Sequence, residues 1–159
     1  MLIPPKNPKL KIAILSYRSA PFGGGQGIYV KDISLALKNL GHSVDVISGE
    51  PYPILEDGVN LIKLPGMNLF ETFIFKDRLK KFIKSPKTFV NIYEFLSALA
   101  GGFPEMYSFG KRANKFLKDN NNYDVVIDNQ SLSYGMLEIQ KRFPLIENDT
   151  SPNNYGLKA

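Results

Sequence analysis

Apolar and polar positions follow two different periods along the chain, and together they predict an α/β protein. The stretch "IAIL" at positions 12–15, preceded by Lys9 and Lys11, is a short apolar run, typical of a strand buried on both faces of a parallel sheet. After a glycine-rich stretch, apolar residues recur at spacings of three and four, which predicts a helix with one buried face. The helix is expected to end at Gly41, because glycine readily adopts the left-handed conformation of a helix end. Its buried positions are Val30, Ile33, Leu37 and Leu40.

Three further strands are predicted by "SVDVIS", "VNLIKL" and "YDVVID". A helix from about Leu132 to Arg142 and a short fifth strand from Pro144 are expected to follow them. Because strands and helices alternate, the connections are right-handed crossovers and the sheet is parallel. The pattern therefore predicts a parallel sheet flanked by helices.

The middle third, from Met67 to Phe109, is rich in Phe and Tyr and is expected to form two or three helices that lie off the sheet. "TFVNIYEFLSALAGG" is apolar but contains Asn91 and Glu94, which favours a buried or cleft-lining helix over a membrane span. "FPEMYSFGKRANKFL" predicts one more helix. Its inward residues are expected to be Phe109, Ala113 and Phe116, and its outward residues Lys111, Arg112 and Lys115.

Composition limits the class of protein. The 159 residues suffice for one domain, and 43% of them are hydrophobic, as in globular proteins. Cysteine is absent, which excludes a disulfide framework and thiolate metal sites. Prolines near the N-terminus interrupt any signal peptide, and no window of about 18 apolar residues is present. We therefore expect a cytoplasmic protein.

The net charge of +5 comes from one segment, "KDRLKKFIKSPK", which holds six cationic residues and Asp77. Its apolar and basic positions predict a short basic amphipathic helix, of the kind that binds anionic membrane surfaces. The candidate membrane-surface residues are Arg78, Lys80, Lys81 and Lys84. The alternative is a helix that packs on its own domain. No nucleic-acid module accompanies the charges, so nucleic acid is not expected as a partner.

Four glycines, Gly23, Gly24, Gly25 and Gly27, lie between the first strand and the first helix. Unpaired N–H groups at a helix N-terminus suit a phosphate, and missing β-carbons let a ligand approach the backbone. The alternative is that the glycines form only a tight turn. The spacing departs from the dinucleotide fingerprint, although Glu50 after the second strand keeps an NAD site open. A Walker loop is excluded, because no Gly-Lys-Ser/Thr follows.

Three blocks in order resemble the N-terminal domain of family 4 glycosyltransferases of the GT-B fold, over about residues 10 to 146. They are "KIAILSYRSAPFGGGQGIYVKDISLALKNLGHSVDVISGEPYP", "GGFPEMYSFGKRANKFL" and "YDVVIDNQSLSYGML". The resemblance implies one Rossmann-like, acceptor-side domain over residues 1–159, with a helical insertion at about 67–118. In that family the nucleotide-sugar is bound mainly by a second domain, and no cofactor or metal is implied.

The resemblance also implies which residues bind substrates. The glycine-rich loop would approach the diphosphate of a nucleotide-sugar, and the loop after the fourth strand would contact acceptor or sugar. The alternative for that loop is that Asp128 and Asn129 cap the next helix. The implied substrate-binding residues are Gly23, Gly24, Gly25, Gln26, Gly27, Asp128, Asn129, Gln130 and Tyr134. Glu105 and Arg112 fit the second block, but a structural ion pair or cap is expected of them.

Departures from the family pattern leave the catalytic residues unassigned. Relatives often carry histidine at the position of Ile127, whereas the single histidine here, His42, lies in a helix-to-strand turn. "ENDTSPNNYGLKA" replaces an expected strand and cleft loop, which suggests truncation or a separate donor-domain chain. We expect this chain alone to be inactive. Its acceptor is unidentified, with a lipid or cell-envelope glycan at the inner membrane face as one possibility, and a noncatalytic nucleotide-binding or membrane-adaptor module is the alternative.

Overall fold

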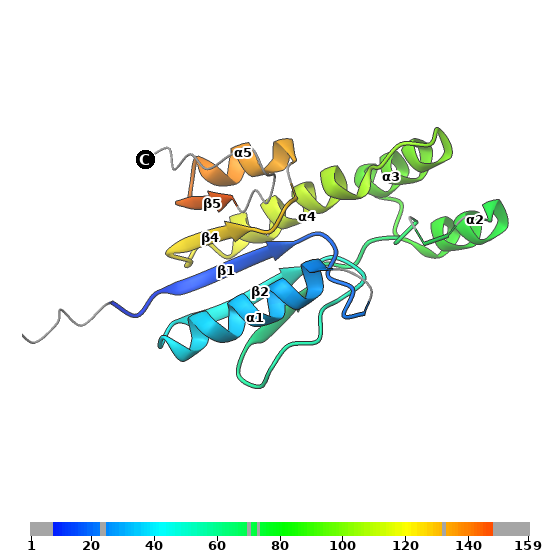
Figure 1. Ribbon diagram of the computed structural model, residues 1–159. Coiled ribbons are helices and arrows are strands. Elements are labelled where there is room, and N and C mark those ends of the chain that lie inside the picture. The colour runs from blue at the N-terminus through cyan, green and yellow to red at the C-terminus, as the bar shows by residue number, and fades with distance from the viewer. Residues whose placement is uncertain (1–7, 23–24, 70, 73, 132, 148–159) are drawn as a thin grey trace, which may run out of the picture.

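A computed structural model describes residues 8–22, 25–69, 71–72, 74–131 and 133–147 of the chain (Figure 1). Strands and helices alternate at both ends of the described part, and three helices follow one another in its middle. In chain order the elements are β1 (Lys11–Ser16), α1 (Gly25–Asn39), β2 (Ser43–Ser48), β3 (Asn60–Lys63), α2 (Phe75–Lys84), α3 (Phe89–Leu99), α4 (Glu105–Asp119), β4 (Val125–Asp128), α5 (Tyr134–Gln140) and β5 (Leu145–Glu147).

The strands form a single parallel sheet in the order β3-β2-β1-β4-β5. β1 lies at its centre, where Ile14 pairs with Val46 of β2 and with Ile127 of β4. Because every strand runs the same way, all the carboxyl ends meet at one edge of the sheet, here called the carboxyl edge. The fold is therefore a Rossmann-like α/β arrangement, as the sequence pattern predicts.

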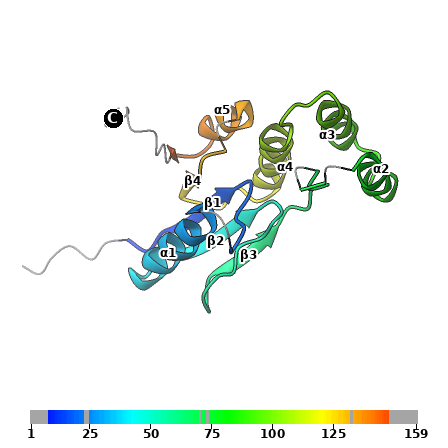
Figure 2. The ribbon, with the colours of Figure 1, turned by 45° about the vertical axis from the view of Figure 1, so that its right-hand side comes forward.

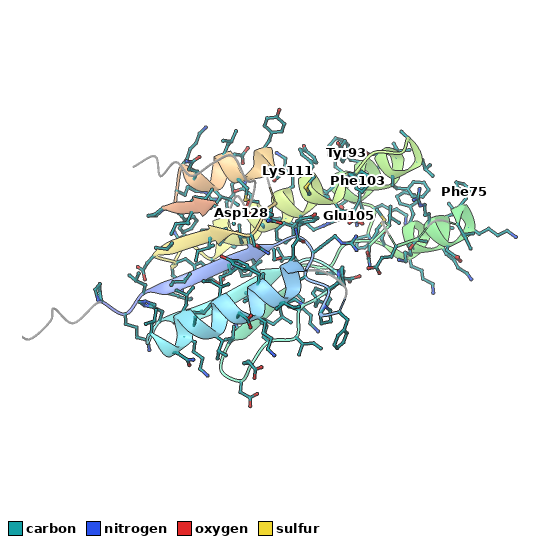
Figure 3. All side chains as sticks on the ribbon, viewed as in Figure 1. Phe75, Tyr93, Phe103, Glu105, Lys111 and Asp128 are labelled. Carbon is teal, nitrogen blue, oxygen red and sulfur yellow. The ribbon has the colours of Figure 1, made fainter. Side chains whose placement is uncertain are left out.

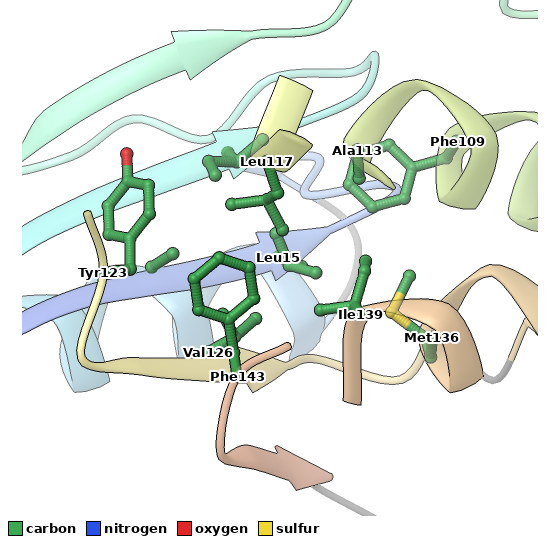
Figure 4. Packing of buried hydrophobic residues seen from close by; sticks show 11 residues of the cluster. Leu15, Phe109, Ala113, Leu117, Tyr123, Val126, Met136, Ile139 and Phe143 are labelled. Atoms are coloured by element: carbon green, nitrogen blue, oxygen red, sulfur yellow. The ribbon is translucent and has the colours of Figure 1, made fainter. Parts of the chain in front are cut away.

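The two faces of the sheet are covered by different helices, as Figure 2 shows. Helix α1 packs on one face, where Val30 lies against Ile12 and Ile14 of the sheet. Helices α4 and α5 cover the other face, and Figure 4 shows Phe109, Leu117 and Ile139 packed around Leu15. The central strand is thus buried on both sides, which explains why its residues 12–15 are apolar without alternation.

Helices α2 and α3 lie beyond the sheet, to the right in Figure 1. They share a small core of their own, formed by Met67, Leu69, Phe95 and Ala98. Phe82 of α2 packs against this core and stacks on Phe95, with 4.3 Å between the ring centroids. Helix α3 contacts α4, so α4 joins this outlying pair to the sheet.

Several predicted details are wrong at the ends of elements. Leu40 is 74% exposed, because α1 ends at Asn39 and Leu40 lies past its buried face. Helix α5 is shorter than predicted, since Arg142 already lies in a turn, and Leu132 lies outside the described residues. In α4 Phe109 and Ala113 are buried as predicted, and Phe116 is partly buried against the same core, whereas the fully buried Leu117 was not predicted.

Tyr123 fastens β4 to β2 at the edge of the sheet opposite the carboxyl edge. Its hydroxyl donates to Asp45 Oδ2 at 2.7 Å. Burial, together with this hydrogen bond, raises the pKa of Tyr123 above its ordinary value. A tyrosine whose pKa is higher in the folded state stabilises the fold fully below about pH 10 and loses that contribution as the pH rises further.

We expect Tyr123→Phe to lower the free energy of unfolding by about 1–2 kcal/mol at pH 7, because Asp45 loses a buried donor. The deficit should shrink above about pH 10, because Tyr123 then ionises in the unfolded parent while the buried hydroxyl of the folded parent stays neutral, which lowers the free energy of unfolding of the parent alone. Urea midpoints of both proteins between pH 7 and pH 11.5 measure this difference. A deficit that stays constant over that range would contradict the role given to the hydroxyl.

Candidate functional site

The strand order reverses direction at the centre of the sheet, and this switch point is where open α/β folds bind ligands. From β1 the chain passes through α1 to β2 on one side, and from β4 it passes through α5 to β5 on the other. The segments after β1 and β4 therefore diverge at the carboxyl edge. The residues predicted to bind substrate lie on these two segments.

The first turn of α1 begins within the glycine-rich stretch, at Gly25. The first four N–H groups of a helix have no acceptor within the helix, and they carry the positive end of its dipole. Gly25 is exposed, and a β-carbon placed on it would meet nothing within 4 Å. Space for an anion therefore exists beside Gly25. Gly23 and Gly24 lie outside the described residues.

Gly27 differs from Gly25, because the chain itself occupies the space beside it. The residue is buried, and a β-carbon there would lie 2.2 Å from the carbonyl oxygen of Ala20. The close approach that requires this glycine is therefore made by the segment after β1. Close packing within the chain, and not a tight turn, therefore accounts for Gly27, and it does not account for Gly25.

Gln26 and Gln130 join the two diverging segments. Gln26 Nε2 donates to Gln130 Oε1 at 2.8 Å, across 104 positions of the sequence. Gln130 has a φ of 60°, a left-handed conformation that few residues other than glycine adopt. Both side chains are partly exposed, so the pair is accessible to solvent where the two segments diverge.

Asp128 and Asn129 are buried and bind the protein itself. Asp128, at the carboxyl edge in Figure 3, is 1% exposed, and its Oδ2 accepts the N–H of Ser131 at 3.1 Å. Asn129 is 2% exposed and donates to Ser16 Oγ at 3.3 Å. These contacts fix the path of the segment after β4. The capping alternative comes close to this geometry, although the helix itself begins only at Tyr134.

Large exposed side chains lie on the segments that follow β1 and β4. Tyr134 begins α5 and is 82% exposed. Phe22, just before the glycines, is 84% exposed, and Ile28 in the first turns of α1 is also exposed. Aromatic and aliphatic side chains of this size are usually covered by a ligand or a partner when they gather at one edge.

Glu50 follows β2 at the same edge, in the position that a ribose-binding acid would take. Its Oε1 accepts the Tyr52 hydroxyl at 3.1 Å. Burial, followed by the nearby Glu50 carboxylate, raises the pKa of Tyr52 to about 12. The Tyr52 hydroxyl therefore stays protonated at neutral pH and occupies one oxygen of Glu50.

Two ion pairs involve the residues of the second sequence block, Arg112 and Glu105. The prediction that Arg112 points outward is wrong: its side chain pairs with Glu94, which is 1% exposed, and donates to Asn91 Oδ1 at 2.8 Å. Glu105 pairs with Arg18 at 3.2 Å. An acidic residue in the otherwise apolar "IYEFL" is the signal that could have indicated the first pair, because a buried carboxylate needs a cationic partner.

The four candidate membrane-surface residues of α2 divide into two pairs. Arg78 donates to the carbonyl of Ala98 at 2.9 Å, and Lys81 donates to the carbonyl of Asn68 at 2.9 Å. Lys80 and Lys84 are exposed. Half of the predicted set therefore also anchors α2 to its neighbours.

Two other kinds of feature are absent from the described residues. No group of three or more His, Cys, Asp or Glu residues there is arranged to hold a metal ion. Among the helices of this part of the chain, none has both the length and the apolar character needed to cross a bilayer.

Comparison with known proteins gives a relationship to one class of enzyme. No family model matches the chain. Over 143 residues it is 43% identical to a protein named MMP alpha-(1->4)-mannosyltransferase from Mycolicibacterium hassiacum. The chain is related to part of a glycosyltransferase.

The aligned region covers 86% of the chain but 34% of the relative, so the chain spans about a third of that glycosyltransferase. The described fold is consistent with one part of such an enzyme. The assignments to family 4 and to GT-B remain predictions from the sequence resemblance.

Proposed function

We propose that this chain is the acceptor-side domain of a family 4 glycosyltransferase of the GT-B fold. Completed by a donor-binding domain, it would transfer a sugar from a nucleotide-sugar to an acceptor. The observation that carries the proposal is the open first turn of α1 at the switch point of a Rossmann-like sheet, in a chain related to a mannosyltransferase. We further propose residues 1–159 as one domain, with the insertion at about 67–118.

The proposed chemistry uses positioning and electrostatics. As the sugar leaves its nucleotide, negative charge develops on the diphosphate, and N–H groups aimed at that charge lower the barrier. The N–H groups of Gly25 and Gln26 would serve this purpose without a metal, because they lie at the positive end of α1. Gln130 and Tyr134 would contact the acceptor or the transferred sugar. No side chain of this chain is assigned as a general acid, a general base or a nucleophile.

A second domain is required because transfer needs both substrates aligned in a closed cleft. The exposed side chains of Phe22, Ile28 and Tyr134 support a covering partner at the carboxyl edge. That partner would be a donor-binding domain, on the same or on a separate chain. This chain without it would bind a nucleotide weakly and show no transfer.

Binding of a nucleoside diphosphate tests the proposal. We expect UDP or GDP at millimolar concentration to raise the melting temperature of the chain, while NAD has no effect, because ligands that bind the native state stabilise it. Gly25→Val should abolish the rise, since its side chain would fill the open space beside the first turn. The melting temperature without ligand should stay unchanged for the same reason.

Ile28→Val is the matched control, because Ile28 is exposed and the change leaves the glycines in place. It should keep the response to the nucleotide. If the nucleotide still raises the melting temperature of Gly25→Val, the nucleotide does not bind at the first turn of α1. A response to NAD alone would favour an oxidoreductase, and binding that never supports transfer with any donor domain would favour a noncatalytic module.

We also propose that α2 and α3 contact an anionic membrane at its cytoplasmic face, which would suit a lipid or cell-envelope acceptor. Helix α2 buries no residue, and its Phe75 and Ile83 are 58% and 64% exposed. Helix α3 turns polar Asn91 and Glu94 inward and leaves Phe89 82% exposed. Exposed apolar side chains beside lysines are the arrangement that interfacial helices use.

A further inference from the structure

A cavity of about 570 Å³ lies between the outlying helices and the carboxyl edge. The segments after β2 and β3 form one wall, the end of α2 and the start of α3 form a second, and α4 forms a third. This volume is larger than a single small ion needs and falls in the range of small-molecule binding pockets. Lys111, labelled on α4 in Figure 3, is one of the lining residues.

The charge of the lining is strongly positive. Five cationic side chains face one carboxylate, that of Glu50. The cationic residues are Lys81, Lys84, Lys111, Arg112 and Lys115. Arg112 forms an ion pair with Glu94, which does not line the cavity. Within the described residues, none of the four lysines has a carboxylate within 4 Å. Like charges converging on a concave surface focus a positive potential there.

Part of this wall is held in place without a ligand. Arg112 is fixed by Glu94 and Asn91, and Lys81 is fixed by the carbonyl of Asn68. Helix α3, of 11 residues, begins at the cavity, with Thr88 and Val90 in the lining. The Thr88 side chain accepts the N–H of Asn91, so the N-terminal turn is ordered. Ordered donors and cations bind an anion at little entropic cost.

We infer that this cavity binds a phosphate group carried by the acceptor, an inference that rests on the proposed function. A dianionic phosphate matches several ammonium groups and a helix N-terminus at once. The remaining volume accommodates the group that bears the phosphate. Glu50 and Gly66 connect the cavity to the carboxyl edge, so an acceptor anchored here would extend toward the sheet.

The two α4 lysines give a sharp test with inorganic phosphate as the probe. The variant Lys111→Ser/Lys115→Ser should weaken phosphate binding about tenfold, a loss of about 1.4 kcal/mol. The control Lys76→Ser/Lys118→Ser removes the same charge from exposed positions that do not line the cavity, and it should bind like the parent. Isothermal titration calorimetry measures the phosphate affinity of both variants, with sodium chloride replaced by sodium phosphate so that the ionic strength stays constant.

Lys84→Ser changes the opposite wall and should repeat the loss, which keeps the inference testable if the α4 variant does not fold. Phosphate that fails to bind the parent overturns the inference. Equal weakening in the cavity variant and the control also overturns it, because diffuse charge would then explain the binding.

Vesicle flotation distinguishes the two sources of such a phosphate. If it belongs to a lipid headgroup, the parent and the control will float with phosphatidylglycerol vesicles but not with phosphatidylcholine vesicles, and the Lys111→Ser/Lys115→Ser variant will float less than either. If it belongs to a water-soluble acceptor, this variant will float as the parent does, and the effect on inorganic phosphate will remain. Flotation of the cavity variant equal to that of the parent, together with unchanged phosphate binding, would refute both sources.

Failure of this inference is distinguishable from failure of the proposed function. Gly25→Val should leave phosphate binding unchanged, because Gly25 does not line the cavity. Phosphate binding in a chain that responds to no nucleoside diphosphate would support the cavity and contradict the glycosyl-transfer proposal. If a nucleoside diphosphate raises the melting temperature of the parent but not of Gly25→Val, and phosphate does not bind, the glycosyl-transfer proposal is supported and the phosphate cavity is contradicted.

Discussion

Replacing Arg112 by methionine should lower the free energy of unfolding by about 3–5 kcal/mol, because it leaves the Glu94 carboxylate buried without its partner. Glu94 is 1% exposed and also accepts the N–H of Met67 at 3.2 Å. Loss of the Arg112 partner would therefore destabilise the packing of α3 on α4 and on the segment after β3. Urea denaturation of the parent and of the variant measures the effect.

The double variant Glu94→Leu/Arg112→Met should recover most of this loss, since it removes the stranded charge and keeps the apolar volume. Lys31→Met is the surface control. Lys31 pairs with Glu56 at 2.7 Å, but both side chains are well exposed, so its midpoint should stay near that of the parent. An Arg112→Met midpoint equal to that of Lys31→Met would show that Glu94 is not held by Arg112.

Replacing Gly27 by alanine should cost about 3 kcal/mol of stability, at the upper end for an overpacked site, because the clash is with backbone. The added carbon would lie 2.2 Å from the Ala20 carbonyl oxygen and 2.9 Å from that of Ser19. Ser19 itself donates its N–H to the Pro51 carbonyl at 2.9 Å, so the segment has little freedom to move.

Gly25→Ala is the matched control, two positions earlier in the same helix. Its β-carbon would enter open space, and alanine favours helix more than glycine does. Thermal melts should therefore place Gly27→Ala well below the parent and Gly25→Ala at or above it. If the two variants melt together, the packing role of Gly27 is wrong, and both glycines would have to be explained by a ligand.

The sheet and its first helix are predictable because their signals are local. The apolar run at 12–15 and the spacing of Val30, Ile33 and Leu37 depend only on which side of each element is buried. Parallel strands have all their carboxyl ends at one edge, so the pattern of strands places the segments after β1 and β4 at the same edge, while the strand order that makes β1 and β4 neighbours comes from the structure. Hydrogen bonding between Gln26 and Gln130 joins these segments in the folded chain.

Burial at the switch point is not predictable in the same way, because it depends on contacts between distant segments. Asp128 and Asn129 have the residue types of a binding loop, yet their side chains bind Ser131 and Ser16. The same limit applies to Arg112, since its charge suggests an outward position and only the packing of α3 brings Glu94 against it.

The cationic cavity shows the same limit on a larger scale. The charge surplus of α2 is visible in the sequence, but the lysines of α4 belong to a different segment. Only the packing of α3 between α2 and α4 brings both groups to one cavity.

Titration of the ¹⁵N-labelled chain with GDP and with UDP, followed by NMR, tests most directly whether a nucleoside diphosphate meets the first turn of α1. We predict that the amide signals of Gly25 and Gln26 move when at least one of these ligands is added, and that the signals of residues 25 and 26 in Gly25→Val do not respond to either ligand. Shifts confined to the residues of the cationic cavity, or no shift with either ligand, would contradict the placement of the donor diphosphate at this helix.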